Sequence, residues 1–384
     1  MSMKRAPLAC AMVLMLGDGV LADELVLMRF PSGGEIAVGG EGPRLILLEQ
    51  TPAGVGLREP AAAAAMPPAP VLLRMTDARL SPTKSASRPV AALTDAGLPL
   101  KTSLTLGVGP RRDDLRWSIA DVDGSPDVLS ELTWRDQKSL MLNVRGEVVW
   151  PSGWLLTSEA GLGAQLQGEV QDSDYDADGR TQEWSRSVGQ ADDGDMLDVL
   201  LTGGHRFHFG AHTLGVRLGY AWHDQNLRFS KATQVVAQPN SFGFTLPPVG
   251  TTFDAMSSYS ASWWGPHLAL DLDLALGGGW RLGLSAWREW VDYEGTGNWA
   301  LRSEFDHPES FTHLAEGRIT GLKAGLTRNW GKSGRLGLAW ERVRGRTDSG
   351  TDITHFTGMG NVPTGLNEVL WDSEIWKLEL AWTF

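Results

Sequence analysis

The C-terminal three-quarters of the chain alternate between apolar and polar residues with a period of two. In residues 267–276, leucine occupies every even position and His, Asp or Ala occupies every odd one. The last segment repeats the pattern, and its apolar set is Trp376, Leu378, Leu380, Trp382 and Phe384. Successive side chains of a β-strand point to opposite faces, so these segments predict strands with one apolar and one polar face.

Short turns and long polar segments alternate between the predicted strands. Tight connections lie at residues 151–153, 209–211, 277–279 and 331–334, whereas residues 171–195, 231–258 and 347–368 are long and polar. Apolar faces ending in tryptophan, polar faces opposite them and this asymmetry of turns are typical of a transmembrane antiparallel β-barrel in a bacterial outer membrane, with a polar lumen. Four short turns join eight strands, and one further strand at each end makes ten. Residues 98–384 far exceed ten spans of roughly 9–11 residues, so we expect the strands to project well above the lipid.

The first residues have the pattern of a secretory signal peptide. Lys4 and Arg5 precede a short apolar stretch at residues 8–16, and Ala22 ends a stretch suited to signal peptidase. We therefore predict a signal peptide over residues 1–22, whose removal also removes Cys10, the only cysteine. A mature chain without cysteine avoids thiol chemistry in the oxidising periplasm.

Residues 23–97 differ in composition from the C-terminal three-quarters of the chain. Residues 24–30 and 44–48 predict short strands, while an Ala/Pro-rich stretch at 60–70 and a Ser/Pro/Lys-rich stretch up to Pro89 indicate a linker. We predict a poorly ordered periplasmic extension over residues 23–97 and the barrel over residues 98–384.

Composition agrees with a barrel. After the signal segment no apolar run reaches about 18 residues, which excludes membrane-spanning helices. The mean hydropathy of −0.17 suits a barrel because polar lumen residues offset lipid-facing ones. Seventeen Trp against four Tyr favour interfacial aromatic girdles over the core of a soluble β-sandwich.

The formal net charge of −12 argues against nucleic acid as a partner and suits attraction of basic ligands.

Several short segments, in their order and spacing, resemble the omptin family of outer-membrane proteases. They are Ser-Leu-Thr-Leu-Gly at 103–107, Ser-Glu-Leu-Thr-Trp at 130–134, Asp-Ser-Asp-Tyr at 172–175 with Trp184 downstream, Glu-Trp-Val at 289–291 and Lys-Ala-Gly-Leu at 323–326. The resemblance covers nearly all of residues 100–384. It implies a ten-stranded barrel with a site at its extracellular mouth.

Omptins cleave peptides next to basic residues, with a water held between an Asp-Asp pair and an Asp-x-His pair on the opposite wall. By the resemblance, the first pair corresponds to Asp172 and Asp174. Residues two apart on a strand share a face, so both carboxylates are expected to point into the mouth. Crowded like charges would raise the pKa of one of them and help it hold a proton near neutrality.

The second pair does not carry over. Gly297 and Trp299 stand at the positions of the family's Asp-x-His, and neither side chain can take a proton from water. His307, next to Asp306 in the same predicted loop, would have to fold back to replace the missing base, and an Asp-His in a polar loop is usually solvated.

The arginines with which omptins bind lipopolysaccharide phosphates are not evident in the sequence. Ser262 stands where one is expected, and Arg228 is a hypothetical substitute. The resemblance still allows lipopolysaccharide as a ligand, and outer-membrane lipid surrounds any such barrel.

A calcium site is a further hypothesis. Asp174, Asp176 and Asp178, followed by Gly179, fit the first half of a calcium-binding loop, in which alternate carboxylates converge on the cation. Ser185 occupies the twelfth position, where such loops carry glutamate, so a solvated acidic loop is the simpler interpretation.

Other polar clusters carry less specific signals. Asp192, Asp193 and Asp195 are expected to extend a negative field across the mouth. We interpret His205, His208 and His212, which flank the turn at 209–211, as turn and girdle residues. The sequence contains no Ser-His-Asp elbow, no phosphate loop and no zinc-type cysteines.

The sequence therefore predicts a barrel with an acidic extracellular cleft that engages cationic peptides or proteins, with endopeptidase activity altered or lost. The alternative is a non-catalytic adhesin that binds host or cell-surface proteins through its loops, with Trp299 and the acidic residues as contacts. A narrow pore is a third hypothesis, although Arg281, Arg335, Lys377 and Glu379 would tend to fill its lumen. No cofactor is required by this interpretation; lipopolysaccharide and calcium are the ligands that it leaves open.

Overall fold

The computed structural model describes residues 24–29, 44–51, 54–58 and 100–384. The predicted signal peptide at 1–22 and the predicted linker lie outside the described residues. Within the N-terminal part, β1 (Glu24–Arg29), β2 (Arg44–Thr51) and β3 (Gly54–Arg58) form a small sheet in which β2 pairs with both neighbours. Strands were predicted in two of these places.

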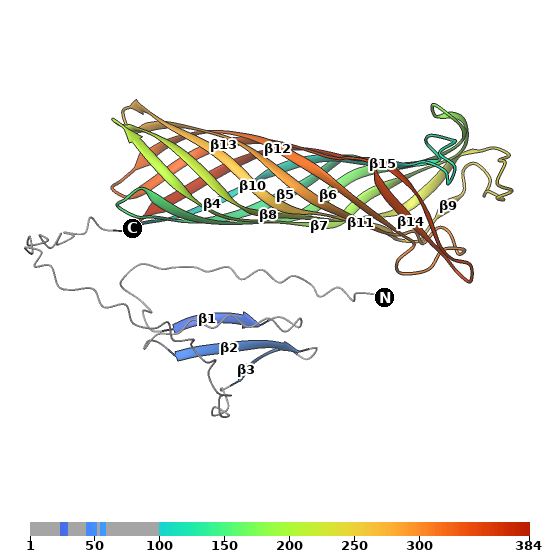
Figure 1. Ribbon diagram of the computed structural model, residues 1–384, viewed down its shortest axis with the longest axis horizontal. Coiled ribbons are helices and arrows are strands. Elements are labelled where there is room, and N and C mark those ends of the chain that lie inside the picture. The colour runs from blue at the N-terminus through green and yellow to red at the C-terminus, as the bar shows by residue number, and fades with distance from the viewer. Residues whose placement is uncertain (1–23, 30–43, 52–53, 59–99) are drawn as a thin grey trace, which may run out of the picture. The chain divides into compact units, whose positions relative to one another are not determined.

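Ten long antiparallel strands form a closed ring from Lys101 onward (Figure 1). They are β4 (Lys101–Ile119), β5 (Ser130–Val149), β6 (Trp154–Ala177), β7 (Thr181–Phe209), β8 (His212–Ala237), β10 (Ser257–Gly277), β11 (Trp280–Asn298), β12 (Phe311–Trp330), β13 (Gly334–Thr347) and β15 (Gly360–Thr383). Pairing of β15 with β4 and of β8 with β10 closes the ring. The prediction of an all-β antiparallel barrel with ten strands is confirmed.

Two short strands complete the extracellular end. β9 (Thr252–Phe253) pairs with the end of β8, and β14 (Gly350–Phe356) lies between β12 and β15, where it prolongs the place of β13 in the ring. No helix in the described part of the chain is suited to crossing a membrane.

The four tight turns lie where they were predicted, but two of the three predicted long loops are wrong. β6 runs to Ala177 and β7 begins at Thr181, so most of residues 171–195 is strand; β14 and the start of β15 likewise occupy much of 347–368. Above the membrane both faces of a strand accept polar residues, so the alternation that marks a strand within lipid is lost there.

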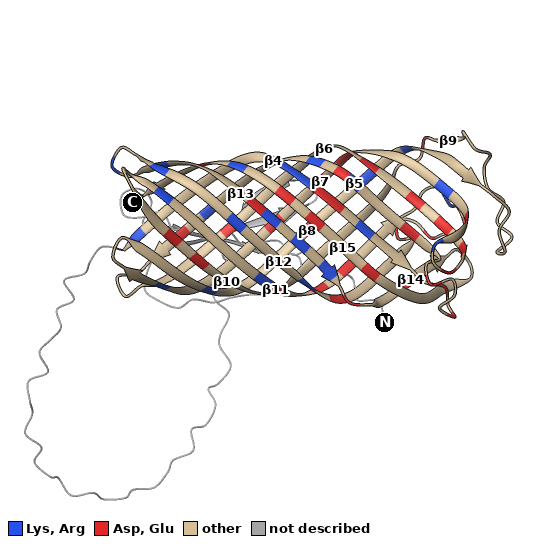
Figure 2. Ribbon diagram, turned by 90° about the horizontal axis from the view of Figure 1, so that it is seen from above, with Lys and Arg blue, Asp and Glu red and all other residues tan. Residues whose placement is uncertain are grey.

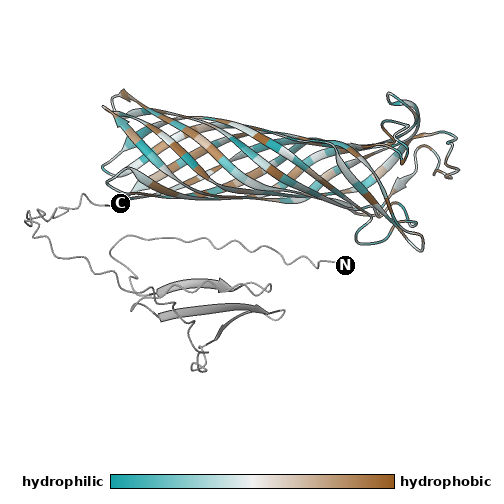
Figure 3. Cartoon of the chain, in the orientation of Figure 1, coloured by the Kyte–Doolittle hydropathy of each residue, from teal (hydrophilic) through white to brown (hydrophobic). Residues whose placement is uncertain are grey.

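The half of the barrel near the short turns has the surface that lipid requires. Apolar and polar residues alternate along its strands (Figure 3). Its exposed large apolar side chains include Leu106, Val108, Leu140, Leu142, Leu162, Leu218, Leu270, Leu284, Leu322, Leu338 and Leu378. Exposed aromatic side chains border this band: Trp150, Trp154, Trp280 and Trp330 by the short turns, and Tyr220, Trp290 and Trp376 towards the loops. Such a band between two aromatic girdles marks the membrane-spanning segment.

The interior changes character along the barrel. Ion pairs fill the membrane half, whereas the extracellular half contains an apolar core whose fully buried members include Trp134, Trp263, Trp371, Tyr259, Tyr293 and Phe229. The expectation of a polar lumen is therefore correct only within the membrane. Above it water surrounds the strands, and burying aromatic rings inside stabilises the projecting part by removing apolar surface from water.

Candidate functional site

Asp172 and Asp174 lie side by side on the lumen face of β6, above the membrane band. In the sheet register they stand beside Leu132 and Ser130, and Leu132 is fully buried in the apolar core. Burial, with the negative charge of Asp174 next to it, raises the pKa of the Asp172 carboxyl well above its usual range. Burial raises the pKa of Asp174 to about 6, although hydrogen bonds from Ser130 and Ser185 oppose the shift. The pair can therefore hold a proton near neutrality.

The opposite wall supplies no base at the two positions that the omptin resemblance indicates. The Trp299 side chain is only 7% exposed and packs against Phe229 and Phe311. A Cβ atom added at Gly297 would overlap the Phe311 ring, so no side chain fits there without moving that ring. These two residues belong to the apolar core.

The loop histidine has a local structural role. His307 Nδ1 lies 2.9 Å from Asn298 Oδ1, and its Nε2 lies 3.2 Å from the Arg302 carbonyl oxygen. The neighbouring Asp306 carboxylate accepts a hydrogen bond from Thr357 Oγ1 at 2.9 Å. Both side chains thus hold the loop between β11 and β12 in shape and face different partners.

A buried Asp-His contact that sequence reasoning missed lies in the apolar core. His313 Nε2 is 3.1 Å from Asp352 Oδ1, and its Nδ1 is 2.8 Å from Tyr259 Oη. Tyr259 in turn lies 2.6 Å from Tyr293 Oη. His313 and Asp352 are 0% and 1% exposed, so no substrate reaches them and the cluster is structural. The only sequence signal for this cluster is the alternation along β12, which places Phe311 and His313 on the same face.

The three carboxylates of the calcium hypothesis bind separate partners. Asp176 accepts hydrogen bonds from Ser241 N and Oγ at 2.9 and 3.1 Å. Asp178 accepts from Ser125 Oγ at 3.0 Å and from Asp127 N at 2.9 Å, while Asp174 faces the lumen. Within the described ranges no group of three or more His, Cys, Asp or Glu side chains is placed to hold a metal ion.

The acidic run on β7 faces outward, not across the mouth as expected. Asp193 lies 3.4 Å and Asp195 4.0 Å from Arg228 of β8, and Asn226 also donates to Asp195. Asp192 is exposed beside them. Ser262 donates to Asp224 on the same outer wall. Arg228 therefore already has two carboxylate partners on its own barrel.

The histidines by the second short turn lie in the periplasmic girdle region. His205 Nε2 is 2.9 Å from the Ser152 carbonyl oxygen, and the Trp154 ring stands perpendicular to the imidazole. His212 accepts a hydrogen bond from the Ala275 backbone amide. This placement fits turn and girdle residues.

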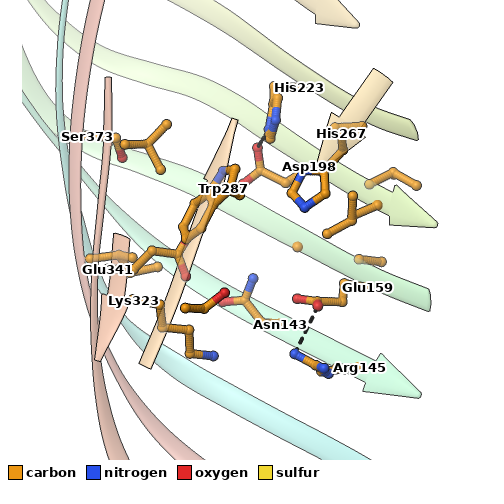
Figure 4. Close-up of a pocket in the computed structure, with 18 of the residues that line it drawn as sticks. Asn143, Arg145, Glu159, Asp198, His223, His267, Trp287, Lys323, Glu341 and Ser373 are labelled. Carbon is orange, nitrogen blue, oxygen red and sulfur yellow. Dashed lines mark hydrogen bonds and ion pairs between the residues drawn. The ribbon is translucent and has the colours of Figure 1, made fainter. Parts of the chain in front are cut away.

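A small cavity of about 120 Å³ lies in the lumen of the membrane half (Figure 4). Its walls carry a chain of polar contacts: Arg111 to Asp198 at 2.7 Å, His223 to Asp198 at 2.8 Å, His223 to Glu289 at 3.1 Å and His267 to Glu289 at 2.9 Å. Lys377 pairs with Glu341 and Lys323 with Glu379. The lumen is thus filled by oppositely charged side chains, with Trp371 and Ile375 of the apolar core at one side of the cavity.

The loops at the far end of the barrel are acidic (Figure 2). In the segments that join the strands there, the acidic residues are Asp121, Asp123, Asp127, Asp178, Asp254, Glu304, Asp306, Glu309 and Asp348, and the basic ones are Arg180 and Arg302. Both arginines pair with glutamates of the same end, Glu131 and Glu304. The extracellular end is therefore strongly negative.

The barrel segment matches a known family of outer-membrane proteins. A family model described as Protochlamydia outer membrane protein matches residues 105–384. This chain belongs to that family. The family name and the fold together place the protein in the bacterial outer membrane. No curated protein matches the chain.

Among solved structures, the outer membrane protease OmpT from Escherichia coli is similar with a TM-score of 0.59 at 11% identity, covering 74% of this chain and 97% of that one. The outer membrane protein OprG and a FadL homologue, both from Pseudomonas aeruginosa, give TM-scores of 0.26 and 0.23 at 11% identity, covering 74% and 73% of this chain and 95% and 90% of theirs. At these identities the OmpT likeness concerns the fold alone. The family match shows an outer-membrane barrel, and membership of the omptins is not part of it.

Proposed function

We propose that this member of the Protochlamydia outer membrane protein family is a non-catalytic surface receptor whose acidic extracellular end binds cationic peptides or proteins. The supporting observation is the way in which the loop carboxylates are held. Asp178 and Asp127 accept hydrogen bonds from the backbone amides of Asp127 and Gly179, which locks two loops together. Asp176 and Asp306 tie two further loops through Ser241 and Thr357.

These donors are neutral, so they fix the positions of the carboxylates and leave their negative charge in place. A fixed array of like charges attracts an oppositely charged partner and speeds its association. A cation that binds relieves the repulsion within the array without having to order the loops first. The extracellular end is thus preorganised for a basic ligand.

The acid pair supports binding better than hydrolysis. Asp172 and Asp174 can hold a proton, but Trp299 and Gly297 opposite them belong to the apolar core and offer no general base. On this proposal the protein shares with the omptins the barrel and a preference for basic ligands, but not the hydrolysis of peptides.

The test is binding of a labelled lysine- and arginine-rich peptide to the detergent-solubilised barrel. Neutralising two loop residues, Asp123→Asn with Asp254→Asn, should weaken binding about threefold to tenfold at low salt, because each exposed charge contributes a fraction of a kcal/mol. The matched control neutralises two acidic residues of the outer wall near the membrane, Asp292→Asn with Glu316→Gln, and should bind as the wild type does.

High salt should abolish the difference between these variants, since about 8 Å is the screening length at physiological ionic strength. Equal affinity of the loop variant and the control would refute the proposal. So would cleavage of the peptide that disappears in Asp172→Ala, because the protein would then be an enzyme.

A further inference from the structure

The outer wall of the barrel carries a basic surface on β13 and its neighbours, just above the membrane band. Arg342, Arg344 and Arg346 alternate along β13 and face outward, beyond Trp340 on the same face. Arg342 and Arg344 share one carboxylate, Asp372, at 3.2 and 3.0 Å. In this cluster two cations share one anion, and Arg344 remains 66% exposed.

The same arrangement recurs one step higher. Arg346 of β13 and Arg116 of β4 share Glu368 at 3.0 and 3.9 Å, and Arg346 is 65% exposed. Each of these two carboxylates serves two arginines. A third carboxylate, Glu374, stands opposite Arg342 in the register and accepts a hydrogen bond from Trp340 Nε1 at 2.9 Å. This wall, which we name the β13 wall (Arg116, Arg342, Arg344, Arg346, Glu368, Asp372 and Glu374), holds four arginines against three carboxylates and so keeps a net positive charge.

The wall of β7 and β8 has the opposite arrangement. Asp193 and Asp195 share one cation, Arg228, and are 55% and 58% exposed. Asp224 accepts a hydrogen bond from the neutral Ser262 hydroxyl. On β8, Asp224 lies two residues above Trp222 and on the same outward face. This surface, the β7 wall (Asp192, Asp193, Asp195, Asp224 and Arg228), therefore keeps a net negative charge above its own aromatic girdle.

The two walls lie on opposite sides of the ring. From β7 the ring runs through β8, β10, β11 and β12 to β13 in one direction, and through β6, β5, β4 and β15 to β13 in the other. β13 is thus five steps from β7 either way. Since the membrane holds every copy upright with the same end outward, a simple sideways shift brings the β13 wall of one barrel against the β7 wall of the next.

The lipid-facing surfaces below the two walls also differ in shape. On the β7 side, Trp154, Leu156, Phe207 and Leu218 surround a hollow. Its floor is Gly203, where an added Cβ would meet only the Leu155 carbonyl oxygen, at 3.9 Å. On the β13 side, Leu336 and Leu338 project into the lipid and are 45% and 52% exposed. The hollow lies at the same end of the barrel as these two leucines, so a leucine side chain of one copy can enter the hollow of a neighbouring copy.

We propose that copies of this chain associate side by side in the membrane, the β13 wall of one against the β7 wall of its neighbour. Contact between different patches on opposite sides of a molecule does not close, so the expected assembly is a row of barrels and not a ring. The opposite charges select the register, and the apolar contact below excludes lipid.

The experiment uses the full barrel in liposomes, with one cysteine on each side of the contact. Asn226→Cys on β8 and Thr320→Cys on β12, in a Cys10→Ser background, are joined by a short bismaleimide. Rows give a ladder of dimers, trimers and longer products on a denaturing gel. Single-cysteine proteins should give dimers at most.

Charge reversal then tests the walls. Asp193→Arg with Asp195→Arg, or Arg344→Asp with Arg346→Asp, should each reduce the ladder about fivefold, since several exposed ion pairs turn repulsive. A barrel carrying all four substitutions should regain it, because both walls then change sign together. Reversing Arg288 and Asp292 on β11, away from both walls, is the matched control and should leave the ladder intact.

Two results would overturn the proposal. One is a ladder that survives each wall reversal. The other is failure of the fourfold variant to regain cross-linking although it folds. If only the arginine substitutions have an effect and they also reduce retention of anionic phospholipid by the purified barrel, the β13 wall binds lipid headgroups and not a second copy. The peptide-binding test of the acidic loops is independent of all three outcomes.

Discussion

Replacing Asp174 by asparagine should stabilise the barrel at neutral pH. The carboxyl group lies on the lumen side of β6, and burial raises its pKa from 3.8 to about 6. That difference corresponds to about 3 kcal/mol of folding free energy lost when the group is ionised. Because Asp174 is only partly buried in the sheet, we expect solvent to reduce the gain for Asp174→Asn to about 2 kcal/mol at pH 7.5.

The pH dependence is set by the direction of the shift. Below pH 3.8 the carboxyl group is protonated in both the folded and the unfolded chain, so its shifted pKa does not lower the free energy of unfolding. Between pH 3.8 and about 6 the unfolded chain releases the proton while the folded barrel keeps it, so stability falls as pH rises. Above that window the full cost remains. The contribution of Asp174 to stability should therefore be more favourable at pH 4 than at pH 7.5, so the stability difference between Asp174→Asn and the wild type should shrink as pH falls from 7.5 to 4.

The assay is urea unfolding of the refolded barrel in detergent micelles, followed by tryptophan fluorescence at several pH values. Asp254→Asn, in an exposed loop, is the control and should change stability by less than about 0.5 kcal/mol. A loss of stability in Asp174→Asn at pH 7.5, or an unchanged pH slope, would refute the reasoning. Either result would mean that the ionised carboxylate has a stabilising partner in the mouth.

The packing leads to three further predictions. Trp299→Ala should lower the free energy of unfolding by about 3–5 kcal/mol, because it leaves a cavity between Phe229 and Phe311. Trp299→Phe should lower it by less, and equal unfolding midpoints for the two variants would contradict the role of Trp299 in the core. In planar bilayers the barrel should show no stable open channel, because paired charges fill the lumen beside the cavity and aromatic rings pack above them; steady single-channel steps would favour the pore hypothesis instead. A chelator should leave the melting temperature unchanged, since Asp176 and Asp178 bind Ser241 and Ser125; a clear drop would revive the calcium hypothesis.

The sequence alone was sufficient for the part of the fold that lipid controls. Within the membrane, outward residues meet hydrocarbon, whereas inward residues line a lumen filled by charged and polar side chains. Alternation such as that of residues 267–276 is therefore required by the surroundings and visible in one strand. The tight turns could also be predicted from the sequence, because glycine at positive φ, as at Gly210 and Gly277–Gly279, marks locally where one strand ends and the chain reverses. The pairing of Asp172 with Asp174 on one face also needed only the period of a strand.

The part above the membrane depended on contacts between segments far apart in sequence. Water on the outside imposes no alternation there, so the projecting strands within 171–195 and 347–368 had no local signal. The aromatic core exists only because ten strands bring Trp134, Trp263 and Trp371 together inside one ring.

The candidate site shows the same division. The outward direction of Asp193 and Asp195 results from the bulges and register of β7 against β8, which no single strand reveals. Gly297 leaves room for the Phe311 ring, and His313 contacts Asp352. Both contacts depend on how β10, β11, β12 and β14 pack around a common interior. Alternation along one strand specifies only which face a side chain takes; its neighbours across the lumen are set by the number, tilt and register of all ten strands.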